Sequence, residues 1–163
     1  ALIHKNNPIL GVIYVPVTKD LYFGNNELGA YKAINVDSDS NFDDINSLLQ
    51  FSFRLPFFID DEILTIVASK SHLTKETSDF IEAIKKTNEN VNIVSKGSSL
   101  KICMVAEGTA TIYPRFGPTM EWDIAAGHAI ASAAGCKITH KDEKTPLVYN
   151  KEELLNPWFI VKR

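Results

Sequence analysis

The sequence predicts an α/β fold in which helices cover a β-sheet. Segments rich in β-branched and aromatic residues alternate along the chain with segments whose apolar residues recur at helical spacing, and this alternation is typical of layered α/β domains. The chain has 163 residues, of which 45% are hydrophobic, so it can bury one substantial core. No repeat or low-complexity linker divides the sequence, and we expect one globular unit.

Short runs of β-branched and aromatic residues indicate the strands. The predicted strands are Ile9 to Val15, Leu21 to Phe23, Glu62 to Ala68, Val91 to Val94, Thr109 to Tyr113, Cys136 to Thr139 and Phe159 to Val161. Between Asn35 and Asp61 the pattern is weaker. There, residues 37–41 predict a loop, and four phenylalanines around Pro56 predict an apolar cluster: Phe51, Phe53, Phe57 and Phe58.

Three segments are predicted to be helices. Thr74 to Lys86 carries Phe80, Ile81 and Ile84 on one face, and Ser98 to Glu107 carries Leu100, Cys103 and Met104, so each has a stripe that can cover a sheet. The third, Asp123 to Ala134, is built mostly of small and apolar residues. Asp123 is placed to cap its N-terminus, and Gly135 to end it in the left-handed conformation.

Composition excludes several classes of protein. No apolar run approaches the roughly 20 residues that cross a bilayer, so we expect no membrane insertion. A net charge of −3 argues against a nucleic acid polymer as the main partner but permits a small phosphorylated ligand. Cys103 and Cys136 lie in apolar runs without metal-ligand spacing and are expected to be buried free thiols of a cytoplasmic protein.

Polar residues at predicted helix starts are candidates for anion and metal binding. Asp123 can be an ordinary cap, or can hold a cation that is shared with an anion at the helix N-terminus. Ser98 and Lys101 are spaced i and i+3, so that the hydroxyl caps and the ammonium projects on the same side. This pair can grip a phosphate, or be a capping serine followed by a solvated lysine.

Two loop positions and one further acidic residue have competing interpretations. Arg115 follows a predicted strand and can make a two-point contact with a phosphate, or pair with an acidic neighbour at the surface. His72 lies between a strand and a helix, where it can contact a ligand or be a polar loop residue. Glu121 is expected to be a solvent-exposed charge near the helix N-terminus, and Thr119 is a weaker candidate.

Several motifs in order resemble the inositol monophosphatase superfamily of magnesium-dependent, lithium-sensitive phosphatases. Gly117-Pro118-Thr119 through Trp122-Asp123, with Ala125-Ala126-Gly127 and Ala134-Gly135, is similar to its C-terminal signature. Two preceding motifs, Ala106-Glu107-Gly108 and Tyr113-Pro114-Arg115, resemble its CysQ-like branch, the 3′(2′),5′-bisphosphate nucleotidases. The resemblance extends through Ser69-Lys70-Ser71-His72, Gly97-Ser98-Ser99-Leu100-Lys101 and residues 150–157.

The resemblance implies a fold, an activity and site residues. The fold is the layered α/β sandwich of the inositol monophosphatase type, and the reaction converts adenosine 3′,5′-bisphosphate to AMP and phosphate. By resemblance, Asp123 is one Mg²⁺ ligand, His72 packs on the adenine, and the substrate-binding residues are Ser71, His72, Ser98, Lys101 and Arg115. An inositol or sugar phosphatase and a non-catalytic nucleotide-phosphate-binding module are the alternatives.

The chain departs from the family in two respects. The family's Asp-Pro-x-Asp-Gly-Thr motif, which supplies most metal ligands, does not occur in these residues, and Thr111 stands where an Asp is usual. We therefore expect a C-terminal portion: residues 1–36 as the last strands of an N-terminal sheet and 37–163 as a C-terminal α/β subdomain. Alone it should be inactive, and its open face should be covered by the missing N-terminal half or by self-association.

Overall fold

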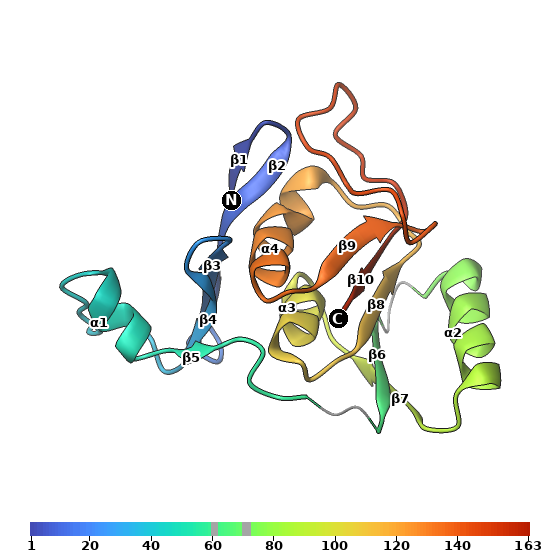
Figure 1. The fold of residues 1–163 in the computed structure, drawn as a ribbon, viewed down its shortest axis with the longest axis horizontal. Helices are drawn as coiled ribbons and strands as arrows, with labels where there is room; N and C mark the ends of the chain where they lie inside the picture. The colour runs from blue at the N-terminus through green and yellow to red at the C-terminus, as the bar shows by residue number, and fades with distance from the viewer. Residues whose placement is uncertain (60–61, 70–72) are drawn as a thin grey trace.

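The computed structural model describes residues 1–59, 62–69 and 73–163, which form two five-stranded sheets and four helices arranged in layers (Figure 1). Helices α3 (Leu100–Glu107) and α4 (Glu121–Ala133) lie between the sheets. Helix α2 (Lys75–Thr87) covers the far side of the second sheet. The α/β fold class expected from the sequence is confirmed.

The first sheet, sheet A, is an antiparallel meander in chain order. Its strands are β1 (Leu2–His4), β2 (Asn7–Val15), β3 (Asp20–Asn25), β4 (Gly29–Ala33) and β5 (Phe53–Arg54). The two residues that join β1 to β2, Lys5 and Asn6, both have positive φ, 47° and 62°, as the tight turns of hairpins require. Because β5 belongs to this sheet, sheet A extends into the region of weak sequence pattern.

The second sheet, sheet B, is mixed, and its order is β7 (Val91–Ser95), β6 (Leu64–Ala68), β8 (Ile112–Arg115), β10 (Phe159–Lys162) and β9 (Lys137–His140). Strands β7 and β8 run parallel to β6, whereas β10 runs antiparallel to both of its neighbours. The carboxyl ends of β6, β7 and β8 therefore meet at one edge of the sheet.

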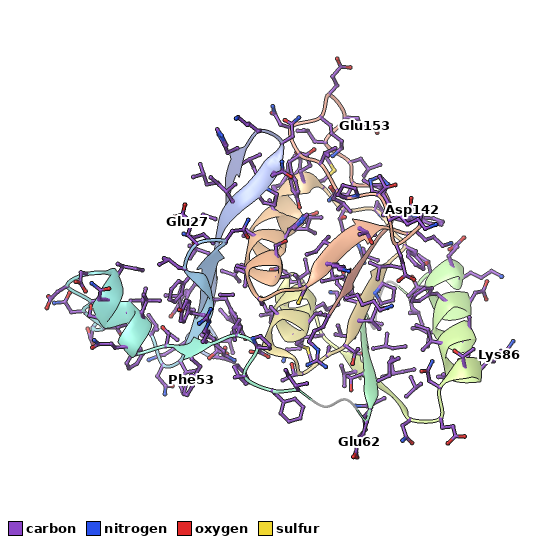
Figure 2. The ribbon with its side chains drawn as sticks, in the orientation of Figure 1. Glu27, Phe53, Glu62, Lys86, Asp142 and Glu153 are labelled. Carbon is purple, nitrogen blue, oxygen red and sulfur yellow. The ribbon has the colours of Figure 1, made fainter. Side chains whose placement is uncertain are left out.

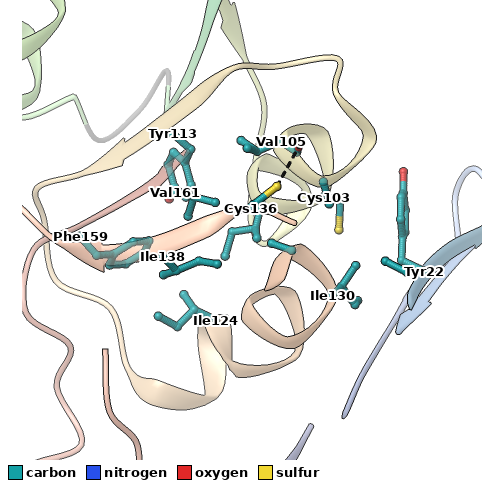
Figure 3. Packing of buried hydrophobic residues seen from close by; sticks show 14 of the residues in the cluster. Tyr22, Cys103, Val105, Tyr113, Ile124, Ile130, Cys136, Ile138, Phe159 and Val161 are labelled. Carbon is teal, nitrogen blue, oxygen red and sulfur yellow. Dashed lines mark hydrogen bonds between the residues drawn. The ribbon is translucent and has the colours of Figure 1, made fainter. Parts of the chain in front are cut away.

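Helix α4 packs closely on sheet A because β2 has a glycine beneath it. A Cβ atom on Gly11 would lie 2.1 Å from the backbone oxygen of Ala126, so only glycine fits there. The main core lies between the sheets, where Figure 3 shows side chains of α3 and α4 packed against β8, β9 and β10. Cys103 and Cys136 are both buried there as free thiols, as expected.

A buried polar network joins sheet A to α3. One carboxylate oxygen of Glu107 accepts from the Tyr22 hydroxyl at 2.6 Å and from the Lys32 ammonium at 2.8 Å. The other accepts from the Thr109 hydroxyl at 3.1 Å. Lys32 also pairs with Asp20 at 3.2 Å, so one ammonium is shared by two carboxylates and each buried charge has a partner of opposite sign.

Two details of the predicted helix starts were wrong. Helix α4 begins at Glu121 with Met120 as its N-cap, and Asp123 lies in its first turn. Its carboxylate caps from there by accepting the Met120 N–H at 2.8 Å. Helix α3 begins at Leu100 with Ser99 as its N-cap, so the Ser98 hydroxyl is not the cap. Gly135 does follow α4 with φ of 86°, as predicted.

Helix α1 (Ile45–Gln50) lies in the region of weak pattern and buries none of its residues. The phenylalanines that follow it are exposed, and Phe53 projects from β5 at the molecule's edge (Figure 2). Phe53 and Phe57 contact edge to face, with ring centroids 6.4 Å apart. Among the helices of the described residues, none is long and apolar enough to cross a membrane.

Candidate functional site

A cavity of about 560 Å³ opens at the edge where the parallel strands of sheet B end. Ser69 follows β6, Gly97 and Ser98 follow β7, and Arg115 ends β8, so the fold gathers them from separate parts of the sequence. The N-terminal parts of α3 and α4 complete the wall. The lining residues are Ser69, Gly97, Ser98, Ser99, Lys101, Ile102, Tyr113, Arg115, Thr119, Trp122, Asp123 and Ile124.

Lys101 is a buried cation of this cavity, with only 4% of its surface exposed. Its ammonium donates to the carbonyl oxygens of Ser98 at 2.9 Å and Lys96 at 3.3 Å, and lies 5.3 Å from the centre of the Tyr113 ring. Burial, with the nearby charge of Arg115, lowers the pKa of Lys101 to about 8. No carboxylate pairs with Lys101 in the described part of the chain, so its charge is available to an anion.

Arg115 is the second cation and carries an unused donor. Its Nη2 donates to the Pro118 carbonyl at 2.9 Å, which ties the guanidinium to the turn before α4. Its Nε is buried and has no hydrogen-bond partner among residues 1–59, 62–69 and 73–163. Buried donors are nearly always satisfied, so this N–H indicates a place for an acceptor from a ligand. The interpretation of Arg115 as a surface ion pair is not supported.

Ser98 takes a different role from the predicted cap. It has a positive φ of 53°, and its carbonyl is the acceptor that holds the Lys101 ammonium. Its side chain lines the cavity beside Lys101. The sequence correctly placed Ser98 and Lys101 together, although a backbone carbonyl makes the link between them.

Asp123 lines the same cavity as these cations and is exposed to solvent. One oxygen, Oδ2, accepts from Met120, which leaves the other for a ligand. No group of three or more His, Cys, Asp or Glu residues that could hold a metal was found in the part of the chain that the structure describes. Magnesium prefers an octahedral shell of oxygen ligands. The described residues supply one such ligand and do not by themselves fit a magnesium site.

Glu121 was expected to be exposed, and this was wrong. Only 8% of its surface is accessible, and its carboxylate accepts from the Asn150 N–H at 2.7 Å, the Lys151 N–H at 3.3 Å and the Lys151 ammonium. Burial opposes its ionisation, but these donors outweigh burial and lower the pKa of Glu121. Glu121 is therefore a structural anion that binds the loop between β9 and β10.

The remaining predicted positions are placed as follows. Ser71 and His72 lie outside the described residues, so their substrate-binding roles stay predictions. Thr119 lines the cavity and Thr111 does not. The Thr111 hydroxyl accepts from the Thr65 N–H at 3.1 Å, which ties it to β6.

The sequence did not predict that two aromatic residues, Tyr113 and Trp122, line the cavity. Both belong to the motifs named above, but neither was a candidate site residue. Trp122 is 66% exposed, unusual for so large an apolar side chain, and it directly precedes Asp123. Sequence reasoning also missed Asn156, which is 5% exposed and binds Thr119. Burial of a polar residue in a loop could not be read from hydrophobic periodicity.

Known proteins resemble this chain in sequence and in fold. The 3′(2′),5′-bisphosphate nucleotidase CysQ of Salmonella typhimurium is 38% identical over 167 residues, covering 99% of this chain and 57% of the relative. The crystal structure of CysQ from Bacteroides thetaiotaomicron, a bacterial member of the inositol monophosphatase family, superposes with a TM-score of 0.94 at 50% identity, covering 99% of this chain and 60% of that one.

A more distant structure, Mycobacterium tuberculosis SuhB, shares the fold at a TM-score of 0.61 and 19% identity, covering 98% of this chain and 55% of that one. The chain thus spans little more than half the length of the proteins it matches. Residues 1–158 match the inositol monophosphatase family. Match, fold and motif order agree, and the chain belongs to the inositol monophosphatase family.

Proposed function

We propose that this chain is the phosphate-binding part of a 3′(2′),5′-bisphosphate nucleotidase, which hydrolyses adenosine 3′,5′-bisphosphate to AMP and phosphate. The observation that carries the proposal is the buried Nε of Arg115, which has no hydrogen-bond partner within the described residues and shares a cavity with the buried ammonium of Lys101. Two cations that pair with no carboxylate of residues 1–59, 62–69 and 73–163 suit a phosphate, because charge-assisted hydrogen bonds to phosphate are strong.

The cavity residues divide into two groups by charge. Ser98, Lys101 and Arg115 would hold phosphate oxygens, and Asp123 would contribute one ligand to a metal ion. Enzymes of this family are generally metal-dependent, and we propose Mg²⁺, inhibited by lithium, as the metal here. Ser71 and His72 would contact the nucleoside, with the His72 imidazole stacked on the base.

The chain by itself would bind and not turn over substrate. Asp123 is the only acidic residue lining the cavity within the described residues, and a single carboxylate holds Mg²⁺ weakly. In this respect the isolated chain would behave as a phosphate-binding module. The remaining carboxylates would come from residues N-terminal to it, with residues 1–36 as the end of their sheet and 37–163 as the C-terminal subdomain.

Binding and hydrolysis can be measured separately on the chain. Calorimetry should detect binding of inorganic phosphate and of AMP to the chain. Arg115→Ala should weaken the binding of both by about tenfold or more, because at least one charge-assisted hydrogen bond is lost. Arg54→Ala is the matched control, since Arg54 is exposed on β5 outside the cavity. Equal affinity in the Arg115 and Arg54 variants would contradict the assignment of the cavity.

Phosphate release from adenosine 3′,5′-bisphosphate by the chain should be negligible. Turnover of about 1 per second or faster, the ordinary enzyme range, would show that the chain holds a complete metal site. A longer form that includes the upstream carboxylates should prefer this nucleotide to inositol 1-phosphate. The reverse preference would favour the inositol phosphatase alternative.

A further inference from the structure

We propose that the loop between β9 and β10, residues 141–158, acts at a distance to orient Arg115 for phosphate binding. Glu121 and Asn156 are the positioning residues, and the turn that starts at Pro118 transmits their effect. The inference rests on the proposed function of the cavity, because it assigns a role toward the same anion. None of these loop residues lines the cavity.

The loop and the turn are joined by a short antiparallel contact. The Asn156 N–H donates to the Thr119 carbonyl at 2.8 Å, and its side-chain amide donates to the Thr119 hydroxyl at 3.1 Å. The Glu121 N–H donates to the Leu154 carbonyl at 3.0 Å, and Met120 pairs with Leu155 between them. Each residue from Thr119 to Glu121 is thus held by the loop.

The Glu121 side chain adds the strongest link. Two backbone N–H groups and one ammonium from Asn150 and Lys151 converge on its buried carboxylate. Removing that charge leaves donors without an acceptor in a largely dry place, which is costly. These donors bind both of its oxygens, and Glu121 does not line the cavity beside Asp123.

The loop is itself anchored, so it can serve as a fixed reference. Leu147 and Tyr149 are 2% and 1% exposed. The Tyr149 hydroxyl is 2.8 Å from Nδ1 of His128 on α4. The backbone N–H of Tyr149 donates to the Asn6 carbonyl at 3.0 Å. Burial lowers the pKa of His128 to about 4, so this anchor stays neutral near pH 7.

The path from the loop to the anion passes through one carbonyl. Arg115 Nη2 donates to the Pro118 oxygen, which is the one side-chain hydrogen bond of Arg115 within the described residues, and Pro118 directly precedes Thr119, which the loop holds. If the contacts between the loop and Thr119 to Glu121 are removed, the turn shifts, and the Pro118 carbonyl shifts with it. The guanidinium then loses its fixed direction, and the entropy of ordering it is added to the cost of binding phosphate.

The test compares two glutamates of the same region. Glu121→Gln should lower the affinity for inorganic phosphate by about tenfold, the value of one charge-assisted hydrogen bond. The affinity is measured by calorimetry on the chain. Glu153→Gln should leave the affinity unchanged, because Glu153 is exposed at the tip of the loop (Figure 2). Asn156→Ala removes the side-chain hydrogen bond to the Thr119 hydroxyl and should also weaken phosphate binding. This second variant tests the proposal if Glu121→Gln does not fold.

A double-mutant cycle identifies Arg115 as the target. In an Arg115→Ala background, Glu121→Gln and Asn156→Ala should cause no further loss of phosphate affinity. If the losses add instead, the loop acts on the protein generally and the proposal is overturned. Thermal unfolding of each variant, measured in parallel, gives its folded fraction. Each measured phosphate affinity is then corrected for that fraction.

A readout without ligand separates this inference from the proposed function. In NMR spectra of ¹⁵N-labelled chain, the Arg115 Nε–H signal should shift and exchange faster with water in Glu121→Gln, and keep its position in Glu153→Gln. An unchanged signal in Glu121→Gln overturns the proposal whether or not phosphate binds. If the wild-type chain binds no phosphate while the signal responds, the proposed function of the cavity fails and the mechanical link stands.

Discussion

Sheets A and B differ in how their faces are covered. Sheet B has α2 on one face and α3 and α4 on the other, and its Ile66, Val67 and Val161 are fully buried. Within the described residues, helices cover sheet A on one face only, where α4 packs and α3 makes its polar contacts. On its other face Leu10, Val12 and Tyr14 are 39%, 52% and 44% exposed. The cavity is built on the sheet that this chain's own helices cover on both faces.

The difference follows from the pattern of β2. One of its inward positions is Gly11, which lets α4 approach closely, and its outward positions Leu10, Val12 and Tyr14 are large and apolar. A strand that is apolar on both sides is typical of a sheet buried on both faces. The outward face of sheet A therefore has the chemistry of an interface.

The contact between sheet A and α4 should be the most sensitive to substitution. In Gly11→Ala the added Cβ would stand 2.1 Å from the Ala126 carbonyl oxygen, so the sheet and the helix must separate. We expect a loss of about 3 kcal/mol in the free energy of unfolding, the upper end of the usual cost of overpacking, measured by urea denaturation. Gly97→Ala is the control, since an added Cβ there has no atom within 4 Å. Equal losses in both variants would mean that α4 does not rest on β2 as described.

The site on sheet B should respond to pH through Lys101. Its pKa is about 8, so it loses its charge as the pH rises through that value, and anion affinity falls on the alkaline side. With sulfate, whose charge is constant over this range, we expect about a tenfold loss between pH 7 and pH 9 by calorimetry. Lys101→Arg keeps its charge there and should flatten the profile. A wild-type profile that is already flat would show that Lys101 does not meet the anion.

The open face of sheet A should mainly affect association. Val12→Lys should reduce self-association at high concentration in analytical ultracentrifugation and change the free energy of unfolding by about 0.5 kcal/mol or less, as for other exposed positions. Val17→Lys is a matched control, because Val17 is 94% exposed outside the strands of sheet A. A wild-type chain that stays monomeric at every concentration would contradict the expected self-association.

The sequence predicted the elements whose apolar pattern faces the core. All seven predicted strands and three predicted helices exist, with ends shifted by a few residues. Helix α1 was missed because it buries no residue, and β5 because two residues carry no periodicity. Strands β1 and β4 were also not among the predicted strands; β4 consists mostly of glycine, alanine and lysine, which are not typical of strands. The start of α4 was displaced because the Glu121 N–H finds its acceptor in Leu154, a contact made by tertiary structure.

The sequence predicted which residues line the cavity better than it predicted the contacts that they make. Ser98, Lys101, Arg115 and Asp123 do line one cavity, as their motifs indicated. The backbone carbonyl of Ser98 accepts from the Lys101 ammonium, and no side-chain pattern predicts such a contact. Glu121 is a buried anion because of partners outside its own helix, which lie 29 and 30 residues away, whereas charge patterning describes only a residue's neighbours in sequence.

The place of β10 in sheet B has a consequence for biosynthesis. This strand comes last in chain order yet lies between β8 and β9, and Phe159, Ile160 and Val161 are at most 1% exposed. While a ribosome is still making residues 159–162, β8 and β9 have no strand between them and their edges are open. Long-range pairing of this kind is slow, and unpaired edges are prone to aggregate. The nascent chain would therefore be most vulnerable just before its cavity-bearing sheet closes.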